Sequence, residues 1–180
     1  MPAFNIDNFL ATVNSIGLSR KNRFEVLIDP PAVTLRGFDN FDGRGLSLLA
    51  ESIAIPELTI SAEVQQIWGP AIHRPKGINY GGFMTVQFYV DQDLRVKKIF
   101  DNWMQYIVDG NQYTVRYQSD YVAPLMTVAQ LDDENTEVYR VRFEEAFPAG
   151  MTQLDLNHGL QNSFHLLQVN FRYRRWYREI

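Results

Sequence analysis

The stretch FMTVQFYVDQDLRVKKIFDNWMQYIVDG, residues 83–110, decides the fold because its hydrophobic period changes halfway along. Over residues 84–90, apolar side chains alternate with polar ones, which is the period-two pattern of a half-buried strand. From Leu94 onward the apolar residues recur three or four positions apart, as they do on one face of a helix. The stretch therefore predicts a strand that leads into one amphipathic helix, over residues 94–108, packed on a sheet.

The residues at both ends of this helix are typical of helix boundaries. Asp91 is placed to cap the first turn, and Gly110 follows the last apolar turn as a stop signal. Asp93 lies four residues before Lys97, which is the favourable order for an ion pair along a helix. No other part of the sequence has a helical pattern of comparable strength.

Composition limits the class of protein. With 180 residues, 46% of them hydrophobic and 21% charged, the chain suits a single domain over residues 1–180 with a substantial core. The absence of cysteine excludes a disulfide framework, a thiolate nucleophile and a sulfur-based zinc site. A net charge of −4 argues against a general nucleic-acid clamp. We expect neither a signal peptide nor a membrane span, because no apolar run approaches about 18 residues.

The remaining patterns predict mostly strands. Alternation bounded by turn residues predicts strands at residues 22–29, 58–67, 112–117, 121–131, 137–146, 151–156 and 164–177. The sequence DDENT, residues 132–136, suits a tight hairpin connection. We therefore expect an α+β, mainly β fold, in which two crossed antiparallel sheets form a small barrel or sandwich flanked by one helix, with long inter-strand loops.

Three segments lie outside this pattern. Residues 1–20 indicate an N-terminal arm with a helical turn near residues 7–13, and residues 68–82 indicate a long loop. Residues 30–56 form a long apolar connection, which either covers its own sheet or docks on a neighbouring subunit, and composition does not separate the two. The candidate interface residues in these loops are Phe38, Phe41, Leu46, Leu48, Leu49, Trp68, His73 and Tyr80.

No catalytic or metal-binding pattern emerges. His73, His158 and His165 are scattered without the spacing of a metal site, and His165 is expected to be a core or interface histidine. The nucleophile elbow, the P-loop and the dinucleotide fingerprint are absent from the sequence. The acidic residues at 132–134 suit a solvated hairpin tip better than a glycosidase pair. We expect a protein that is not an enzyme and needs no cofactor.

Arginines concentrate near the C-terminus, at positions 172, 174, 175 and 178. They either face phosphate groups or pair with acids on a neighbouring strand or subunit. Because the chain as a whole is acidic, pairing with acids is the favoured interpretation.

The order of several motifs resembles that of a known family. These motifs are NRFEVLIDP, GPAIHRPKGINYGG, MTVQFYVDQDLRVKKIFDNWMQYIV, SDYVAPLMTVAQLD, VYRVRFEEAFPAGMTQLDLNH and VNFRYRRW. Together they resemble the tail tube proteins of contractile-tailed bacteriophages, over residues 22–176. The most telling parts are the strand followed by D-x-D-L-x-V-x-K-x-F-x-x-W and the later A-F-P with L-D-L. The first twenty residues and the final YREI match no pattern of the family.

The resemblance implies a structural virion protein that forms hexameric rings, which stack into a helical tube after assembly in the host cytoplasm. It implies a contractile sheath outside the tube, tape-measure protein and DNA in the lumen, and baseplate and tail-terminator proteins at the ends. Ring stacking would fall to residues 1–19 and 30–56, and the helix at residues 94–108 would lie on the outer flank. An acidic lumen would repel DNA phosphates and so let the genome pass.

Other interpretations stay open. The same fold would serve a baseplate tube initiator or the tube of a phage-derived contractile injection system. From a different class, a small monomeric β-barrel with a ligand pocket would also fit the strand pattern. Strands with one apolar and one polar face, and long open edges, favour assembly because ring closure removes those edges.

Overall fold

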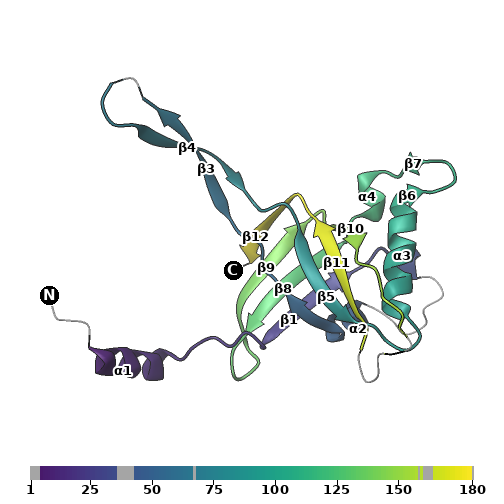
Figure 1. The fold of residues 1–180 in the computed structure, drawn as a ribbon, viewed down its shortest axis with the longest axis horizontal. Coiled ribbons are helices and arrows are strands. Elements are labelled where there is room, and N and C mark those ends of the chain that lie inside the picture. The colour runs from purple at the N-terminus through teal and green to yellow at the C-terminus, as the bar shows by residue number, and fades with distance from the viewer. Residues whose placement is uncertain (1–4, 36–42, 67, 158, 160–163, 180) are drawn as a thin grey trace.

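The computed structural model describes residues 5–35, 43–66, 68–157, 159 and 164–179 (Figure 1). Its strands form two four-stranded sheets and two separate two-stranded hairpins, with every neighbouring pair antiparallel. The first sheet has the order β1 (Phe24–Asp29), β8 (Leu125–Leu131), β9 (Glu137–Glu144) and β12 (Arg175–Glu179). The second sheet has the order β10 (Phe147–Met151), β11 (Leu166–Arg172), β5 (Met84–Tyr89) and β2 (Ala50–Ile53).

The two sheets pack face to face around one apolar core, and their strands cross in direction (Figure 1). Inward-facing side chains alternate with outward-facing ones along each central strand, as the period-two pattern requires. The core residues of the first sheet include Val26, Ile28, Met126, Val128, Val141 and Phe143, and those of the second include Met84, Val86, Phe88, Leu167, Val169 and Phe171. The mainly-β fold class is confirmed as a sandwich, in which each sheet keeps two open edges in the described part of the chain.

Helix α3 (Arg95–Ile107) completes the core on one side of the sandwich (Figure 1). Its buried stripe consists of Val96, Ile99, Phe100, Trp103 and Ile107. The Phe100 ring centroid lies 5.3 Å from that of Phe88 on the second sheet, and the Trp103 indole N–H donates to the Tyr121 carbonyl at 2.7 Å. The predicted strand at residues 84–90 and the predicted helix are therefore both confirmed.

The first turn of α3 is held by Asp91, as predicted. Its Oδ1 accepts from the Arg95 backbone N–H at 2.8 Å, and its Oδ2 lies 2.6 Å from the Arg95 guanidinium. Burial raises the pKa of the Asp91 carboxyl, but the Arg95 hydrogen bond and the backbone N–H groups of the first turn outweigh it, so the pKa is lowered. The predicted pair of Asp93 with Lys97 is wrong, because Lys97 pairs with Asp101 at 2.7 Å.

The predicted stop at Gly110 is also wrong. The helix ends at Ile107 because Val108 is extended, with φ of −125°, and joins a small hairpin. This hairpin pairs β6 (Val108–Asp109) with β7 (Thr114–Val115), so only the centre of the strand predicted at residues 112–117 forms.

Residues 68–82 differ most from expectation. The sequence predicted a loop there, but residues 72–79 form strand β4 (Ile72–Asn79), which pairs with β3 (Thr59–Gln65). The loop was predicted because residues 68–82 contain Pro75 and Gly77. In the structure these two residues lie where the register of the hairpin shifts, opposite Ser61 and Ala62. An outer strand of a free hairpin tolerates a proline because only one of its edges is paired.

The C-terminal segment also changes sheets. The single strand predicted at residues 164–177 breaks after Arg172, because β11 pairs with β5 in the second sheet and β12 pairs with β9 in the first.

The strand predicted at residues 151–156 lies earlier, at β10, an edge strand whose register shifts at Pro148. The segment before β8 begins with the short helix α4 (Gln118–Tyr121), whereas a strand was predicted from residue 121.

Part of the apolar connection at residues 30–56 covers the protein's own core. It contains the 3-10 helix η1 (Ala32–Leu35), helix α2 (Gly43–Leu48) and β2. Leu46 is fully buried, which favours the self-covering interpretation for this part of the segment. His165 is exposed just before β11, so the core alternative is wrong, while the interface alternative stays a prediction. None of the described helices is long and apolar enough to span a bilayer.

Candidate assembly surface

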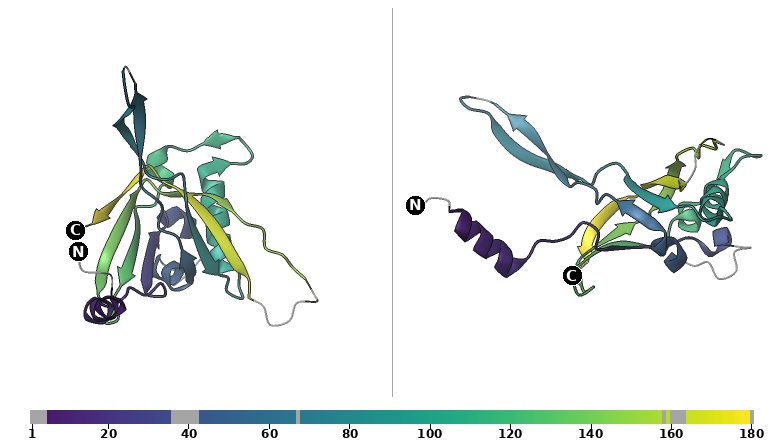
Figure 2. Two further views of the ribbon diagram at one scale, coloured as in Figure 1. Left: turned by 60° about the vertical axis from the view of Figure 1, so that its left-hand side comes forward. Right: turned by 60° about the horizontal axis from the view of Figure 1, so that its bottom comes forward.

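The hairpin β3–β4 projects from the sandwich and has no buried residue (Figures 1 and 2). Residues opposite each other in an antiparallel pair share a face. Ile60 pairs with Ile78, and Val64 pairs with His73, so these side chains lie on one face, which is largely apolar. The other face is mostly polar, with the pairs Thr59–Asn79, Ser61–Gly77 and Glu63–Arg74. We call the face of Ile60, Ala62, Val64, His73, Pro75 and Ile78 the hairpin apolar face.

The base of this hairpin is fixed to the junction between β11 and β12. The Tyr80 carbonyl accepts from the Tyr173 hydroxyl at 2.6 Å and from the Trp176 indole N–H at 3.1 Å. Burial raises the pKa of the Tyr173 phenol, while the charge of Arg172 acts in the opposite direction. Gly81 has φ of +78°, and a Cβ there would lie 3.1 Å from the Tyr173 hydroxyl. These contacts set the direction in which the hairpin leaves the body.

A second projection is helix α1 (Ile6–Ile16), which lies away from the sandwich (Figure 1). It starts where the Asn5 side chain accepts from the Asp7 N–H at 3.0 Å. None of its residues is buried, and its apolar stripe includes the exposed Ile6, Leu10 and Ile16. The predicted helical turn at residues 7–13 is thus confirmed within a longer helix.

The connection from α1 to β1 is attached to the end of β8 and to the turn between β8 and β9. The Gln130 side-chain amide donates to the carbonyls of Arg20 at 2.8 Å and Arg23 at 2.7 Å. Asp133 lies 3.4 Å from the Arg20 guanidinium and 3.8 Å from that of Arg23. We call Arg20, Arg23, Gln130 and Asp133 the arm anchor, because they direct the arm away from the sandwich (Figure 2).

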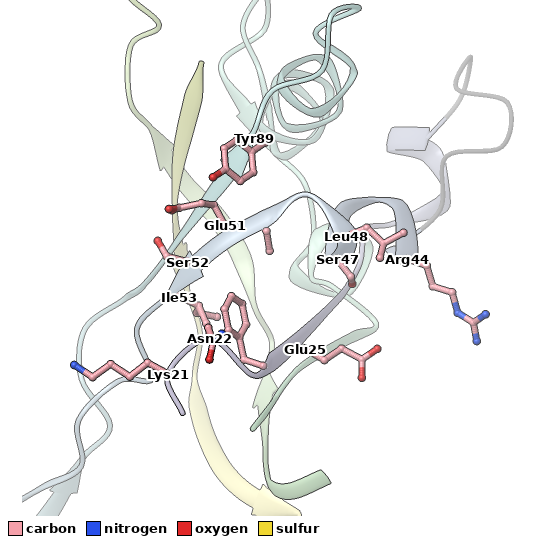
Figure 3. A pocket seen from close by; sticks show the side chains of 12 residues that line it. Lys21, Asn22, Glu25, Arg44, Ser47, Leu48, Glu51, Ser52, Ile53 and Tyr89 are labelled. Carbon is pink, nitrogen blue, oxygen red and sulfur yellow. The ribbon is translucent and has the colours of Figure 1, made fainter. Parts of the chain in front are cut away.

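A groove of about 1000 Å³ separates β1 from β2, the edge strands of the two sheets (Figure 3). Its apolar lining includes Phe24, Leu48 and Ile53, and helix α2 contributes part of one wall. Phe24 and Ile53 also pack against the core, so the groove opens onto the interior of the sandwich. Charged side chains of both signs, those of Lys21, Glu25, Arg44 and Glu51, also line it.

The edges of the two sheets differ in regularity. The outer strands of the second sheet, β2 and β10, both carry register shifts, whereas β12 pairs with β9 without one. Two of the four C-terminal arginines pair with acids, as favoured from sequence: Arg175 lies 2.5 Å from Glu144, and Arg174 lies 2.9 Å from Glu145. The other two make different contacts, since Arg172 donates to the Gly82 carbonyl and Arg178 lies over the Tyr139 ring. Neighbouring charges of opposite sign thus offset one another along β9 and β12.

The predicted interface residues are distributed unevenly. Leu46 must be removed from the set, because its side chain is fully buried in the subunit's own core and offers no surface to a partner. Leu49 is partly buried against that core, and its carbonyl accepts from the Tyr89 N–H at 2.8 Å. Leu48 is 87% exposed at the groove. Phe38 and Phe41 lie outside the described residues.

The other candidates belong to the hairpin. Trp68 follows β3 and is 92% exposed, while His73 lies on the hairpin apolar face and Tyr80 lies at the hairpin base. Sequence reasoning missed Ile60 and Ile78, although the alternation in residues 58–64 was a signal that one face of β3 is apolar. It also missed the arm anchor, whose partners lie more than 100 residues apart in sequence.

Little in the described residues points to a catalytic or metal-binding site. In the ranges that the structure describes, no three histidine, aspartate or glutamate side chains gather in a way that would hold a metal ion. The perturbed carboxyl groups, Asp91 and Glu144, each pair with an arginine and belong to ordinary structural contacts. The distinctive surfaces are therefore the two projections and the groove.

Comparison with known proteins agrees with a role in assembly. The family model described as phage tail tube protein matches residues 19–179. No curated protein sequence matches the chain. A chain in the anti-feeding prophage baseplate has a TM-score of 0.63 at 16% identity, over 90% of this chain and 95% of that one. A chain in the sheath-tube complex of the extracellular contractile injection system PVC has a TM-score of 0.64 at 12% identity, over 94% and 96%. At these identities the likeness shows a shared fold.

Proposed function

The chain belongs to the phage tail tube protein family and is a structural tail tube subunit, and we propose that its copies form hexameric rings that stack into a tube. The observation that carries this proposal is the hairpin apolar face, which no described part of the subunit covers. A two-stranded hairpin is at best marginally stable alone in water, so this one needs a partner surface. Another copy of the chain provides that surface in a stacked assembly.

The fixed base of the hairpin supports stacking. Because the Tyr80 carbonyl is held by Tyr173 and Trp176, the hairpin leaves the sandwich in one direction in every copy. A rigid projection that meets the same surface on the next copy makes a heterologous contact, and such contacts produce rings or open helical assemblies. Trp68, at 92% exposed, then lies where the hairpin reaches farthest from its base.

Closure of a ring is supported by the open sheet edges. The first sheet ends at β12, whose outer edge has no strand partner among the described residues. Exposed backbone N–H and C=O groups on such an edge favour pairing with a strand of another copy. We expect lateral contacts at the regular edges of the first sheet and stacking contacts at the hairpin.

The partners follow from the tail tube role. We propose a contractile sheath around the tube, tape-measure protein and DNA in the lumen without specific contacts, and baseplate and tail-terminator proteins at the ends. The net charge of −4 favours passage of DNA over tight binding. We also propose that the protein is a component of the virion assembled in the host cytoplasm, has no catalytic role and folds as one domain, since both large sheets share one core.

The test is the assembly state of the purified protein. We expect negative-stain images to show six-fold rings and tubes, and sedimentation velocity to show species far heavier than the 20.9 kDa monomer. A protein that stays monomeric at millimolar concentration, with its hairpin apolar face accessible to solvent, would refute the proposal.

A second candidate role shares this fold. The solved chains of similar fold come from a baseplate and a terminating cap as well as from a sheath-tube complex. A baseplate initiator or terminator would form single rings, whereas a tube subunit elongates without limit. The length distribution of assemblies of the purified protein separates these roles, and the copy number in a purified particle separates a tail tube from an injection-system tube.

A further inference from the structure

We propose that Glu144 and Glu179 keep DNA from binding inside the tube, because they neutralise arginines on the face that lines its channel. This face is the outer side of the first sheet, which points away from the core, and we call it the channel face. On β9 and β12 it carries Arg140, Arg142, Glu144, Arg175 and Glu179. The inference rests on the proposed function and names the residues that let a duplex pass.

The position of the channel face follows from how the first sheet can continue into a neighbouring copy. Its four strands alternate in direction, so the edge strands β1 and β12 run in opposite directions, and each pairs with its neighbour without a register shift. Strand β12 of one copy can therefore pair antiparallel with β1 of the next.

The bulk of the subunit decides which face of this continuous sheet points inward. The core, the second sheet and helix α3 all lie on the other face of the first sheet (Figure 1). In a closed ring these layers need the larger circumference, which is on the outside. The channel face is therefore on the inside, where DNA passes.

Arg175 is held by Glu144 on the channel face. The Arg175 Nε donates to Glu144 Oε2 at 2.5 Å, and its Nη2 donates to Oε1 at 3.0 Å. Such two-point contacts between a guanidinium and a carboxylate are the strong form of this pair. The Arg175 hydrogen bond also lowers the pKa of the Glu144 carboxyl, which keeps this carboxylate ionised.

Glu179 acts on the other two arginines of the channel face. Its carboxylate lies 3.3 Å from the Arg142 guanidinium and 3.8 Å from that of Arg140. Arg140 also pairs with Glu137, at the start of β9. Each arginine in the strands of this face thus has at least one carboxylate beside it.

These pairs reduce the attraction of the arginines for phosphate. Binding of DNA to arginine is driven by release of counterions, and an arginine already neutralised by a carboxylate contributes little to this release. A phosphate that approached it would also meet the negative charge of the carboxylate. Glu25 and Asp29 add exposed acids to the same face on β1, so acids outnumber arginines there.

The outer face of the second sheet is the alternative wall, and it has a different chemistry. Its hydroxyl and amide side chains bond to one another: Thr85 donates to Asn170 and Ser52 donates to Gln87, both at 2.8 Å. Both edges of this sheet carry register shifts, so it is less suited to continue from copy to copy. If this face lined the channel, removal of Glu144 and Glu179 would not affect DNA in the lumen.

The variant Glu144→Gln, Glu179→Gln tests the inference, because it removes two charges and frees Arg142 and Arg175. Tubes are assembled with a short DNA duplex, pelleted over a salt series and treated with nuclease. At about 50 mM salt we expect roughly tenfold more retained duplex than in tubes of the unmodified protein, protected from nuclease and lost toward about 200 mM salt. The matched control, Asp101→Asn with Asp120→Asn, removes two charges on α3 and α4 and should retain as little as the unmodified protein.

Three results would overturn the inference. They are equal retention by the variant and the unmodified protein, equal retention by the variant and the control, and a retained duplex that nuclease digests, which would place the arginines outside. If the double variant forms no tubes, Glu179→Gln alone, which frees Arg142, is compared with Asp101→Asn, which frees Lys97, under the same criteria.

A second measurement locates the channel face directly and uses the absence of cysteine. Tyr177→Cys places a thiol on the channel face, and Lys98→Cys places one at an exposed position of α3. In tubes a small maleimide should label both variants, whereas a protein-sized maleimide should label only Lys98→Cys. Equal labelling by the large reagent would overturn the inference while the tubes themselves support the proposed function. If the unmodified protein forms no tubes, the proposed function fails, and this inference fails with it.

Discussion

The hairpin apolar face offers the sharpest test of how this subunit stacks. Ile60 and Ile78 face each other across β3 and β4, and the double variant Ile60→Thr, Ile78→Thr replaces both with a polar residue. Threonine is β-branched as well, so the strand preference of the hairpin is kept. Neither isoleucine belongs to the core, so the isolated subunit should fold and melt as before.

The size of the effect follows from the exposed surface. Full burial of an isoleucine side chain contributes roughly 1.5–3 kcal/mol, and with 65% of Ile60 and 56% of Ile78 exposed, docking would gain about 1–2 kcal/mol for each. Losing both gains weakens each stacking contact by roughly 2–4 kcal/mol, which corresponds to about a 30- to 1,000-fold weaker association. The critical concentration for tube formation should rise accordingly.

Pelleting of tubes across a dilution series measures the critical concentration, and thermal melting of the dilute subunit serves as the folding check. The matched control is Val115→Thr, which changes an equally exposed β-branched residue on β7 and should leave both quantities unchanged. The reasoning is refuted if the double variant assembles at the same concentration as the unmodified protein, or if Val115→Thr impairs assembly equally.

Three further predictions concern the fold that supports this surface. Trp103→Phe should lower the free energy of unfolding by about 2–4 kcal/mol in chemical denaturation, because it removes the donor to the partly buried Tyr121 carbonyl and opens a cavity, while Trp68→Phe at an exposed site should have little effect. Gly81→Ala should reduce both stability and tube formation more than Gly17→Ala. The two glycines have similar φ near +77°, but only at Gly81 would an added Cβ lie within 3.1 Å of a neighbouring atom. Equal melting temperatures of the two variants would contradict this prediction. Asp91→Asn should lower the free energy of unfolding at pH 7. Because the folded-state pKa of Asp91 is lowered, the difference in stability between the variant and the unmodified protein should shrink as the pH falls below about 4. A difference that stays undiminished at about pH 2–3 would show that the charge is not the cause.

Local patterns in the sequence were sufficient for the elements that bury one face. The alternation at residues 84–90 and the helical period after Leu94 correspond to β5 and α3, because each pattern reflects which side chains must leave water. Asp91 could be recognised as the cap of the helix for a similarly local reason, since a carboxylate a few residues before the first turn reaches its free N–H groups. The motif order further indicated the family that the comparison then showed.

Contacts between distant segments could not be read in the same way. The chain crosses from the second sheet to the first near Tyr173 although the alternation continues, because strand pairing with β5 and β9, not the period, ends one strand and begins the next. Leu46 has the same apolar character as Leu48, yet one is buried and the other is 87% exposed, since the position of α2 beside β1 decides which side chain meets the core.

The sequence by itself determined the class of the fold and the central strand and helix. It also showed that the predicted loops carry more apolar side chains than loops exposed to water usually do. Only the tertiary structure decided where these apolar side chains lie: on one face of a hairpin whose second strand was predicted to be a loop, on helix α1 and in a groove between two sheet edges. The physical reason is that hydrophobic periodicity records which side chains avoid water, whereas the partner that covers each of them is set by contacts between segments far apart in the chain.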